Sequence, residues 1–462
     1  MSFKECFGKL IKYANQLIFE KILRINVILI RDRFFYFLKD KYPSIKNPFL
    51  FRFNPIKCLM FIIEIKTQEF YTRLKYGTKK LFINNNCRIN PQKIKFYQEK
   101  QLNEYSSIMR GVWDQSKIKI EGSPIYKAFN QRFHEGKKWQ ETEFYQTIIG
   151  RITNNEIKRD FKNKEEFDKK FSEIDAIYYQ LTDILYETQE EQTISNKIFE
   201  KLKTQEIFNN ISVAIDREGQ LLVVEGLYKF LITKLLKIPE IPIFIKARHK
   251  KWIDFRKELF LSSRNYQIHK MFYQRFTHPD LQSLPYKHGD HRFNLIKKNL
   301  HLTRGTLLDI GANFGYFCHK FEDEGFDCYA VEPNPMHVYF MKKLKKAENK
   351  QFKIIAQSIF EYQKGKELVF DVVLALNIFY HFCKNREAYL SLIKLLKRLK
   401  TKILYFEAHD PTKLQNANVY RNYNPNEFLE FIINNSCLNK YKFIGKTKYG
   451  RSLYELSSDC FS

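Results

Sequence analysis

From residue 304 onward the chain alternates between short apolar runs and longer segments whose apolar residues recur three or four positions apart. Short apolar runs are typical of buried strands, and the longer spacing is typical of helices. The predicted strands are 306–310, 328–332, 352–356, 370–376 and 402–407, with a terminal hairpin of 441–447 and 453–457. The predicted helices are 315–325, 335–347, 386–399 and 426–435. This alternation predicts a parallel sheet with helices on both faces and a ligand crevice at the carboxyl ends of the strands.

Two earlier regions carry patterns of their own. Residues 211–215 and 221–225 are apolar runs on either side of an Asp/Gly turn, and a helix over 227–236 and a strand over 241–245 follow. This order predicts a small α/β unit. Residues 164–188 carry apolar residues at helical spacing and predict a helical spacer.

Residues 1–40 also have helical periodicity, with Phe3 and Phe7 on the apolar face and Lys4 off it. A basic amphipathic helix of this kind can lie in a membrane interface. The alternative, which we prefer, is that the stripe packs on the protein's own core. Basic and aromatic residues mixed over 73–100 could bind single-stranded nucleic acid, although their order is irregular.

The strong positive charge is the most informative feature of the composition. The formal net charge is +28, and residues 1–100 hold 21 Lys and Arg against 7 Asp and Glu. Such a bias implies a polyanionic neighbour, namely RNA or another nucleic acid, an anionic membrane surface or an acidic glycan, unless it merely reflects a Lys-rich genome. The eight cysteines have no regular spacing, which predicts reduced thiols and a cytoplasmic location. No apolar run is long enough for a transmembrane segment, so any membrane attachment is expected to be peripheral, at the inner face.

Candidate chemistry begins where a predicted strand ends in Asp309 and leads into a Gly-x-x-x-Gly turn, Gly311 to Gly315. Glycines there let the backbone approach a ligand closely. Glu332 follows 21 residues after Gly311, at the end of the next strand, and a carboxylate at that separation suits two ribose hydroxyls. Asn313 stands where a dinucleotide fingerprint requires glycine. The pattern therefore favours another cofactor that contains a nucleoside.

The turn, Glu332 and residues 370–381 resemble, in order, motif I, the ribose-binding acid and the fourth motif of class I S-adenosylmethionine (SAM) methyltransferases. Motif I is carried by Asp309, Gly311, Asn313 and Gly315. The resemblance implies an α/β, Rossmann-like, seven-stranded methyltransferase domain with SAM as its cofactor. It also implies that the backbone of the turn cradles the methionine part, that Asp309 steadies that loop and the sulfonium side, and that Glu332 binds the ribose.

The same resemblance assigns the remaining cofactor contacts. Gln357 or Ser358 takes the place near the adenine where relatives usually have an acid, and Asn377 faces the amino-carboxylate of the cofactor. Arg292, in the segment before motif I, is a candidate lid residue. No metal site is predicted, because His288 and its neighbours lack a third ligand at matching spacing.

Three residues are candidates for catalysis. His381, beside Tyr380, lies next to the expected position of the cofactor methyl group and is the best general-base candidate. The alternative is a histidine at a helix start that bonds to backbone. His409, close to Glu407 after the fifth strand, belongs to a second polar cluster that could hold the substrate.

Residues 110–256 resemble proteins with a ParB/sulfiredoxin-like domain, through Trp113-Asp114, residues 133–142 and the small α/β unit. The family opens its helix with a Gly, any residue and then His-Arg, which hold phosphates. Here Gly226 is followed by Leu227, Tyr228 and Lys229. We therefore interpret the unit as a degenerate structural or substrate-presenting module.

These patterns divide the chain into five regions. They are a basic, mostly helical region (1–109), a helical connector (110–204), the ParB/sulfiredoxin-like domain (205–260), a linker or lid (261–290) and the methyltransferase domain (291–462). The fourth motif lacks both the Pro-Pro-aromatic box of amino-methylating DNA enzymes and the Pro-Cys of cytosine-C5 enzymes. The first hypothesis is therefore O-methylation of a glycan, glycolipid or related small-molecule precursor. The alternatives are an RNA (tRNA) methyltransferase that grips phosphates with its basic half, and a non-catalytic SAM-binding protein.

Overall fold

The computed structural model describes residues 85–98, 108–154, 163–189, 211–263, 271–409 and 419–458, with the single residues 156, 161, 269 and 412. All of these belong to one compact unit, Phe82–Ser462. The predicted helix over residues 1–40 lies outside the described residues, as does half of the mixed basic and aromatic stretch over 73–100. None of the described helices is both long and apolar enough to cross a membrane.

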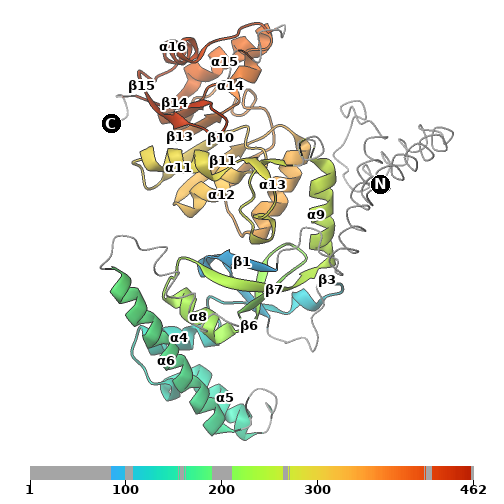
Figure 1. Cartoon of the computed structure of the whole chain (residues 1–462), viewed down its shortest axis with the longest axis vertical. Coiled ribbons are helices and arrows are strands. Elements are labelled where there is room, and N and C mark those ends of the chain that lie inside the picture. Colours follow the sequence, from blue (N-terminus) through green and yellow to red (C-terminus); the bar gives the residue numbers. More distant parts are fainter. Residues whose placement is uncertain are drawn as a thin grey trace, which may run out of the picture. The chain divides into compact units, whose positions relative to one another are not determined.

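A seven-stranded sheet forms the C-terminal part of this unit (Figure 1). Its strands are β10 (Gly305–Ile310), β11 (Phe326–Val331), β12 (Lys353–Ile355), β13 (Leu368–Leu376), β14 (Leu399–Glu407), β15 (Lys440–Lys446) and β16 (Ser452–Ser457). Their order is β12-β11-β10-β13-β14-β16-β15, in which β10 to β14 are parallel and the last two strands form an antiparallel hairpin. The predicted seven-stranded α/β domain is confirmed.

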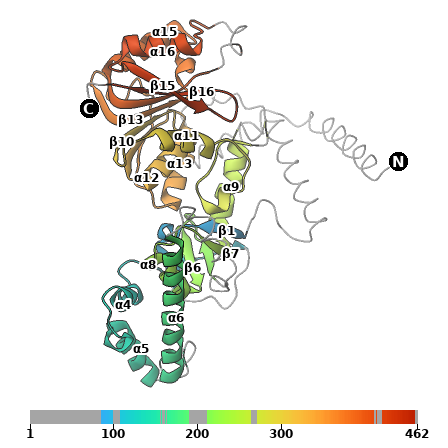
Figure 2. The same cartoon turned by 60° about the vertical axis from the view of Figure 1, so that its left-hand side comes forward.

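Helices cover both faces of this sheet (Figures 1 and 2). They are α11 (Asp290–Asn299), α12 (Tyr316–Asp323), α13 (Pro335–Ala347), α14 (Phe379–Phe382), α15 (Arg386–Arg398) and α16 (Pro425–Asn435). Side chains of α11, α12 and α13 form one apolar core with the sheet, and those of α14, α15 and α16 form the other. Two apolar layers of this kind bury both faces of a parallel sheet, as its continuous apolar strands require.

Helix starts follow the local chemistry of the sequence. Asn334 caps α13 by accepting a hydrogen bond from the backbone of Met336, and Pro335 occupies the first turn, where no backbone donor is needed. Asn424 and Glu427 form a capping box at the start of α16. Such caps explain why helix boundaries in this domain agree closely with those expected from the sequence.

A second sheet precedes the methyltransferase-like part. Its strands are β1 (Asn86–Ile89), β2 (Phe96–Gln98), β3 (Ile108–Met109), β4 (Lys117–Lys119), β5 (Ser212–Ile215), β6 (Leu221–Glu225) and β7 (Ile241–His249). They are ordered β1-β7-β5-β6-β2-β4, and β3 also pairs with β7. The accompanying helices are α4 (Pro124–Phe133), α5 (Glu143–Thr153), α6 (Lys164–Gln189), α8 (Leu227–Leu235) and α9 (Lys250–Ser262). The strands and helix predicted over 211–245, and the helix over 164–188, are confirmed.

Before residue 120 the described residues include strands that the sequence pattern did not indicate. Strands β1 to β3 lie in the region expected to be mostly helical, and β4 lies in the expected helical connector. Each is two to four residues long, so none shows enough of a period-two pattern to be distinguished from a loop in the sequence. The sheet therefore joins residues on both sides of the predicted boundary at 205. The ParB/sulfiredoxin-like resemblance of this unit stays a prediction.

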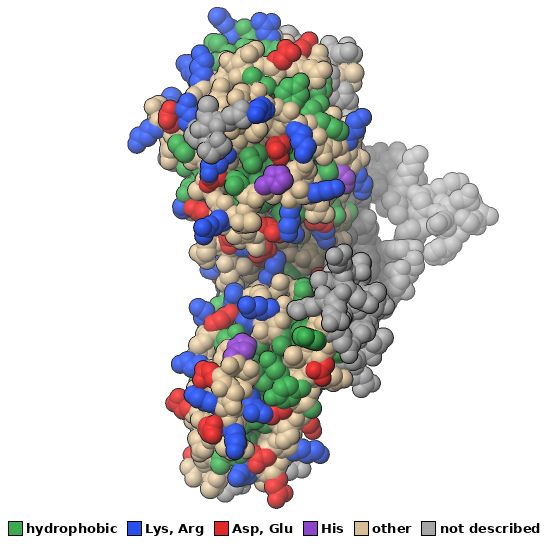
Figure 3. Space-filling view, turned by 90° about the vertical axis from the view of Figure 1, so that its left-hand side faces the viewer, with side chains coloured by type: hydrophobic (Ala, Val, Ile, Leu, Met, Phe, Trp, Pro, Cys, Tyr) green, Lys and Arg blue, Asp and Glu red, His purple; other side chains and the backbone are tan. Residues whose placement is uncertain are grey.

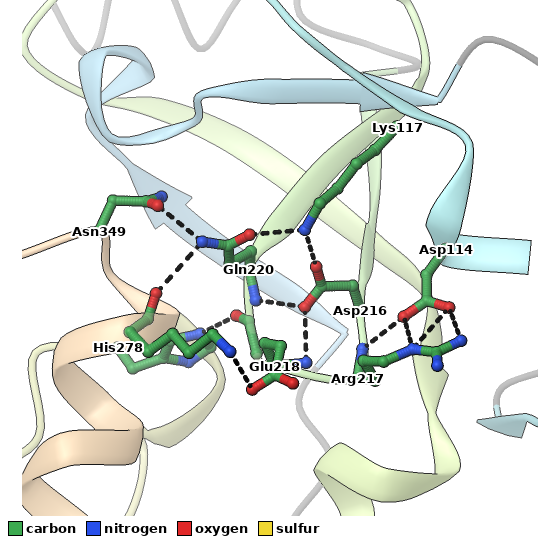
Figure 4. A network of polar contacts seen from close by, with 10 residues as sticks. Asp114, Lys117, Asp216, Arg217, Glu218, Gln220, His278 and Asn349 are labelled. Carbon is green, nitrogen blue, oxygen red and sulfur yellow. Dashed lines mark hydrogen bonds and ion pairs between the residues drawn. The ribbon is translucent and has the colours of Figure 1, made fainter. Parts of the chain in front are cut away.

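The turn between β5 and β6 contacts the end of α13 through a polar network, which we call the hairpin interface (Figure 4). Gln220 donates to the Asn349 side chain at 2.6 Å and to the carbonyl of Lys346 at 3.2 Å, and Glu218 pairs with the Lys346 ammonium at 3.2 Å. On its other side Gln220 accepts from Lys117 at 2.6 Å. Because α13 begins beside Glu332, the hairpin interface holds the far end of a helix that starts at the candidate site.

Asp280 ties the segment between the two sheets to the first of them. Its carboxylate accepts from Arg248, Arg256 and Trp252, each at 2.8 Å, and all four side chains are buried. The neighbouring His278 ring contacts the carbonyl oxygen of Gly219 at 2.8 Å. The same segment contains β8 (Phe272–Gln274) and β9 (Tyr286–His288), a parallel pair. Asp280 thus lies between the two strands and fixes the loop that joins them.

Candidate functional site

A cavity of about 260 Å³ opens at the carboxyl ends of β10, β11 and β13. Six of the predicted cofactor-binding and catalytic residues line it. They are Asp309, Gly311, Asn313, Glu332, Asn377 and His381. Arg292 also lines it, and so do Tyr273 and Gln274 of β8. The structure therefore places most of the predicted residues around one space at the expected edge of the sheet.

The turn after β10 has the backbone that the glycine pattern predicts. Gly311 has a φ of 79°, and a Cβ on it would lie 3.0 Å from Cδ1 of Ile378. Gly315 has a φ of 82° and starts α12, and a Cβ there would lie 2.9 Å from Cγ of Met341. Gly315 does not line the cavity, so its part is to turn the chain into the helix. Asn313, with a φ of 55°, also takes the left-handed conformation, which asparagine tolerates better than most residues.

Glu332 is the central carboxylate of the cavity. One of its oxygens accepts from the backbone N–H of Asn313 at 2.8 Å, and the other accepts from the N–H of Asn334 at 2.9 Å. Nδ1 of His337 lies 3.3 Å from the second oxygen. The side chain is 6% exposed, so it faces the cavity rather than bulk solvent. These two bonds fix Glu332 in one orientation and tie the glycine turn to the start of α13.

Among the residues predicted from the sequence, three buried oxygen atoms in the cavity wall have no hydrogen-bond partner. They are Oδ2 of Asp309, Oδ1 of Asn313 and Oδ1 of Asn377. Burial, and then the neighbouring charge of Glu332, raise the pKa of Asp309 to about 7. Buried acceptors without donors cost free energy, so a wall that carries three of them is shaped for a ligand that brings donors or positive charge.

Replacing Asp309 with asparagine should remove a pH dependence of stability. In the unfolded chain the carboxyl loses its proton near 3.8, whereas in the ligand-free folded protein it keeps it until about pH 7. The wild type should therefore lose stability as pH rises between these values, by roughly 4 kcal/mol at most, whereas Asp309→Asn should lack this contribution. Urea unfolding of both proteins at pH 5 and pH 8 measures it. An equal loss in the two proteins would contradict the burial of an unpaired carboxylate.

Asn377 lies at the end of β13, also in the left-handed conformation, with a φ of 59°. Its amide donates to the hydroxyl of Tyr273 at 2.9 Å. Sequence analysis missed Tyr273 and Gln274, because β8 is three residues long and carries no motif. Gln357 and Ser358 follow β12 but do not line the cavity, and Gln357 is exposed. Their predicted contact with the adenine stays a prediction.

His381 belongs to the short helix α14 and lines the cavity. Partial desolvation of the His381 ring, and then the nearby cations Lys384 and Arg451, lower its pKa to about 4. The ring is therefore neutral at pH 7. Tyr380 and His409 do not line the cavity but stack behind it, with their ring centroids 5.3 Å apart. His409 also contacts the side chain of Asn422 at 3.1 Å. Of the three predicted catalytic residues, His381 is therefore the one in direct contact with the cavity.

Arg292 is a buried residue of α11, rather than part of a mobile lid, and donates to Glu407 at 2.7 Å. Burial raises the pKa of Glu407, and the charges of Arg292 and Arg451 oppose that rise. The cluster of Glu407 and His409 predicted from the sequence thus includes two arginines that no motif indicated.

Comparisons with known proteins agree with this geometry. Residues 280–428 match the family model described as a methyltransferase domain. The chain carries a SAM-dependent methyltransferase domain. Its matched segment runs from just before β9 into α16, so it leaves out the hairpin of β15 and β16, and it includes every residue that we predicted to contact the cofactor. No curated protein sequence matches the chain.

Several solved structures resemble parts of the chain. The bifunctional kinase-methyltransferase WbdD is 19% identical, with 41% of this chain and 44% of that chain covered and a TM-score of 0.35. NodS, an N-methyltransferase from Bradyrhizobium japonicum WM9, is 14% identical, with 36% and 93% covered and a TM-score of 0.29. Magnesium protoporphyrin IX methyltransferase (ChlM) from Synechocystis PCC 6803, with bound SAM, is 13% identical, with 36% and 76% covered and a TM-score of 0.28. The chain thus spans less than half the length of WbdD, and likenesses this low carry no substrate to this protein.

The cofactor of the methyltransferase domain is S-adenosylmethionine, and the residues of the cavity fit it. SAM offers ribose hydroxyls and an ammonium group as donors and carries a positive sulfonium. The cavity offers the fixed carboxylate of Glu332 and three buried oxygens that need donors. Among the described residues, no group of three or more His, Cys, Asp or Glu could hold a metal ion.

Proposed function

We propose that the protein transfers the methyl group of SAM to an oxygen atom of a glycan, glycolipid or related small-molecule acceptor. The observation that carries the proposal is that His381, neutral at pH 7, lines the same cavity as Asp309 and Glu332. A proton acceptor and a cofactor site that share one cavity are what hydroxyl methylation requires.

Each residue has a part in this proposal. Glu332 binds the ribose hydroxyls, and the backbone from Gly311 to Gly315 cradles the methionine part. Asp309, with its partnerless oxygen, takes the cationic side of the cofactor. Asn377 faces the amino-carboxylate, and its bond to Tyr273 fixes its amide. Gln357 or Ser358 contacts the adenine.

His381 then handles the proton. Bound SAM supplies an electrophilic methyl group on a sulfonium centre. The acceptor hydroxyl gives its proton to a ring nitrogen of His381 as its oxygen takes the methyl group, which leaves S-adenosylhomocysteine (SAH) and a protonated imidazole. Tyr380 and His409 pack behind His381 and position its ring. Residues of β8 and α11 form part of the wall around the reacting atoms.

The first sheet serves as a structural or substrate-presenting module in this proposal. Glu225, just before the glycine that starts α8, is ion-paired with Lys246. The family also has an acidic or amide residue at this place, but Tyr228 and Lys229 stand where it has the His-Arg pair that holds phosphates, so ParB-like chemistry is not supported here. On the face drawn in Figure 3, Lys and Arg side chains are interspersed with acidic ones rather than gathered into one stripe. That distribution gives no support to RNA as the first choice of acceptor.

Methyl transfer from tritium-labelled SAM to fractionated glycolipid, glycan and RNA extracts tests the proposal. Label should enter the glycolipid or glycan fraction, and His381→Ala should lower the rate about 100-fold with SAM affinity within twofold. His301→Ala, at an exposed histidine away from the cavity, is the matched control and should transfer at the wild-type rate. Unchanged turnover in His381→Ala would show that His381 is not the general base. Label found only in RNA, with a steep salt dependence of binding, would show that the acceptor is RNA rather than a glycan or glycolipid.

A further inference from the structure

Arg292, which lines the cavity, belongs to a cluster of charged residues at the carboxyl end of β14. Glu407, the last residue of that strand, lies 2.7 Å from Arg292 and 3.8 Å from Nη1 of Arg451, which precedes β16. Arg292 and Glu407 are buried, and the Arg451 side chain is 16% exposed. One carboxylate therefore faces two guanidinium groups, which leaves an excess of positive charge at the wall.

Both arginines keep a buried donor without a partner. Nε of Arg292 and Nη1 of Arg451 are buried and make no hydrogen bond. Buried donors on a charged group are costly to leave unsatisfied. Both arginines approach the same oxygen of Glu407, Oε1, and Nη1 of Arg451 stays 3.8 Å from it. The other oxygen, Oε2, is also buried without a partner, but even if it accepted from one arginine, the other would keep an unsatisfied donor.

Lys384, an exposed residue near His381, adds a third cation. Its ammonium lies 5.5 Å from the ring centroid of Tyr380, and it has no ion-pair partner among the residues that the structure describes. The positive charges lower the pKa values of two nearby histidines. Burial and then Lys384, Arg451 and His409 lower the pKa of His381, and burial and then Arg292, Lys287 and Arg451 lower that of His288.

We infer that Arg292, Arg451 and Lys384, here called the cation cluster, bind an anionic group of the methyl acceptor, a phosphate or a carboxylate. The inference rests on the proposed function, because it assigns the acceptor side of the same cavity. Arginine donates to such anions in pairs of parallel hydrogen bonds, and a lysine adds a point charge. An anion bound there supplies the missing acceptors and balances the excess charge. A neutral sugar carries no negative charge, so it would leave the excess positive charge of the cluster unbalanced.

The anion also serves the proton transfer. A negative charge bound beside His381 favours its protonated form, so the pKa of the ring rises toward its usual value when the acceptor is in place. The base is then stronger when a substrate is present than in the empty site. The cation cluster thereby selects the acceptor and tunes the residue that takes its proton.

Calorimetry on the full chain loaded with SAH tests the inference, with inorganic phosphate and acetate as separate probes at low salt. We expect one of the two to bind at a single site, and its identity distinguishes phosphate from carboxylate. Arg451→Gln and Lys384→Gln should each weaken that binding about tenfold or more, and Arg451→Lys should restore part of it. Lys364→Gln removes an exposed lysine that is paired with Glu361 away from the cavity, and it should bind the probe as the wild type does.

NMR titration of His381 gives a second readout that a structural role would not move. The bound probe should raise the pKa of His381 in the wild type, and Arg451→Gln should raise it without any probe. Probe binding that is equal in wild type, Arg451→Gln and Lys384→Gln would overturn the inference. A matching loss of SAH affinity in the same variants would also overturn it, because the cluster would then serve the cofactor. If the wild type bound no SAH, the proposed function itself would fail, and the same phosphate titration on the unloaded protein would still decide for or against the cluster.

Discussion

Asp280→Ala is expected to lower the free energy of unfolding by about 3–5 kcal/mol, the largest loss of stability that we predict for a single substitution. The buried guanidinium groups of Arg248 and Arg256 share this carboxylate, and the indole of Trp252 donates to it as well. Without it, two positive charges stay buried next to each other with much less compensation. Urea unfolding followed by circular dichroism measures the change.

Asp254→Ala is the matched control for this experiment. Asp254 pairs with Lys250 one turn away on α9, and its side chain is 43% exposed, so its removal should cost less than about 1 kcal/mol. Asp280→Asn, which keeps the shape of the side chain, provides a second variant if the alanine protein does not fold. A loss in Asp280→Ala no greater than in Asp254→Ala would show that the buried cluster does not hold the two sheets together.

Glu332→Ala should have the largest effect on the cofactor, with a loss of SAM affinity on the order of 100-fold or more. The carboxylate does two things that alanine cannot do. In the proposed function it accepts from the ribose hydroxyls, and in the structure it holds the backbone of Asn313 and Asn334 in the cavity wall. Calorimetric titration with SAM measures the affinity of each protein.

Asp327→Ala serves as the control for Glu332, because Asp327 is an exposed carboxylate on the same strand and is paired with Lys353. It should bind SAM as the wild type does. If Glu332→Ala kept wild-type affinity for SAM, Glu332 would not be the residue that binds the ribose, even if the cofactor still bound elsewhere in the cavity.

The methyltransferase domain was predictable because its signals are long and local. Strands such as β13 are continuous apolar runs, helices such as α13 carry a cap and a proline at their start, and the motif from Asp309 to Gly315 fixes a turn that few sequences other than glycine-rich ones adopt. Each of these features acts within about fifteen residues. The order of the motifs then sets the cavity, since parallel strands bring their carboxyl ends to one edge.

The parts that the sequence did not reveal depend on contacts between distant residues. Tyr273 reaches Asn377 over a separation of 104 residues, and Arg292 reaches Glu407 over 115. Neither pair has a local pattern, because each side chain is selected by what packs beside it in space. The strands β1 to β4 were missed for a related reason. They are too short for periodicity and gain their structure by pairing: β1 and β3 pair with β7, β2 pairs with β6, and β4 pairs with β2.

The account depends above all on the cavity between Asp309, Glu332 and Asn377 being the binding site of a sulfonium nucleoside. Titrating SAM and SAH separately into the wild-type protein in a calorimeter tests this most directly. We predict that each binds once per chain, with micromolar affinity typical of such a site. Absence of heat from both ligands, or binding that survives unchanged when Glu332 and Asp309 are both replaced by alanine, would contradict it.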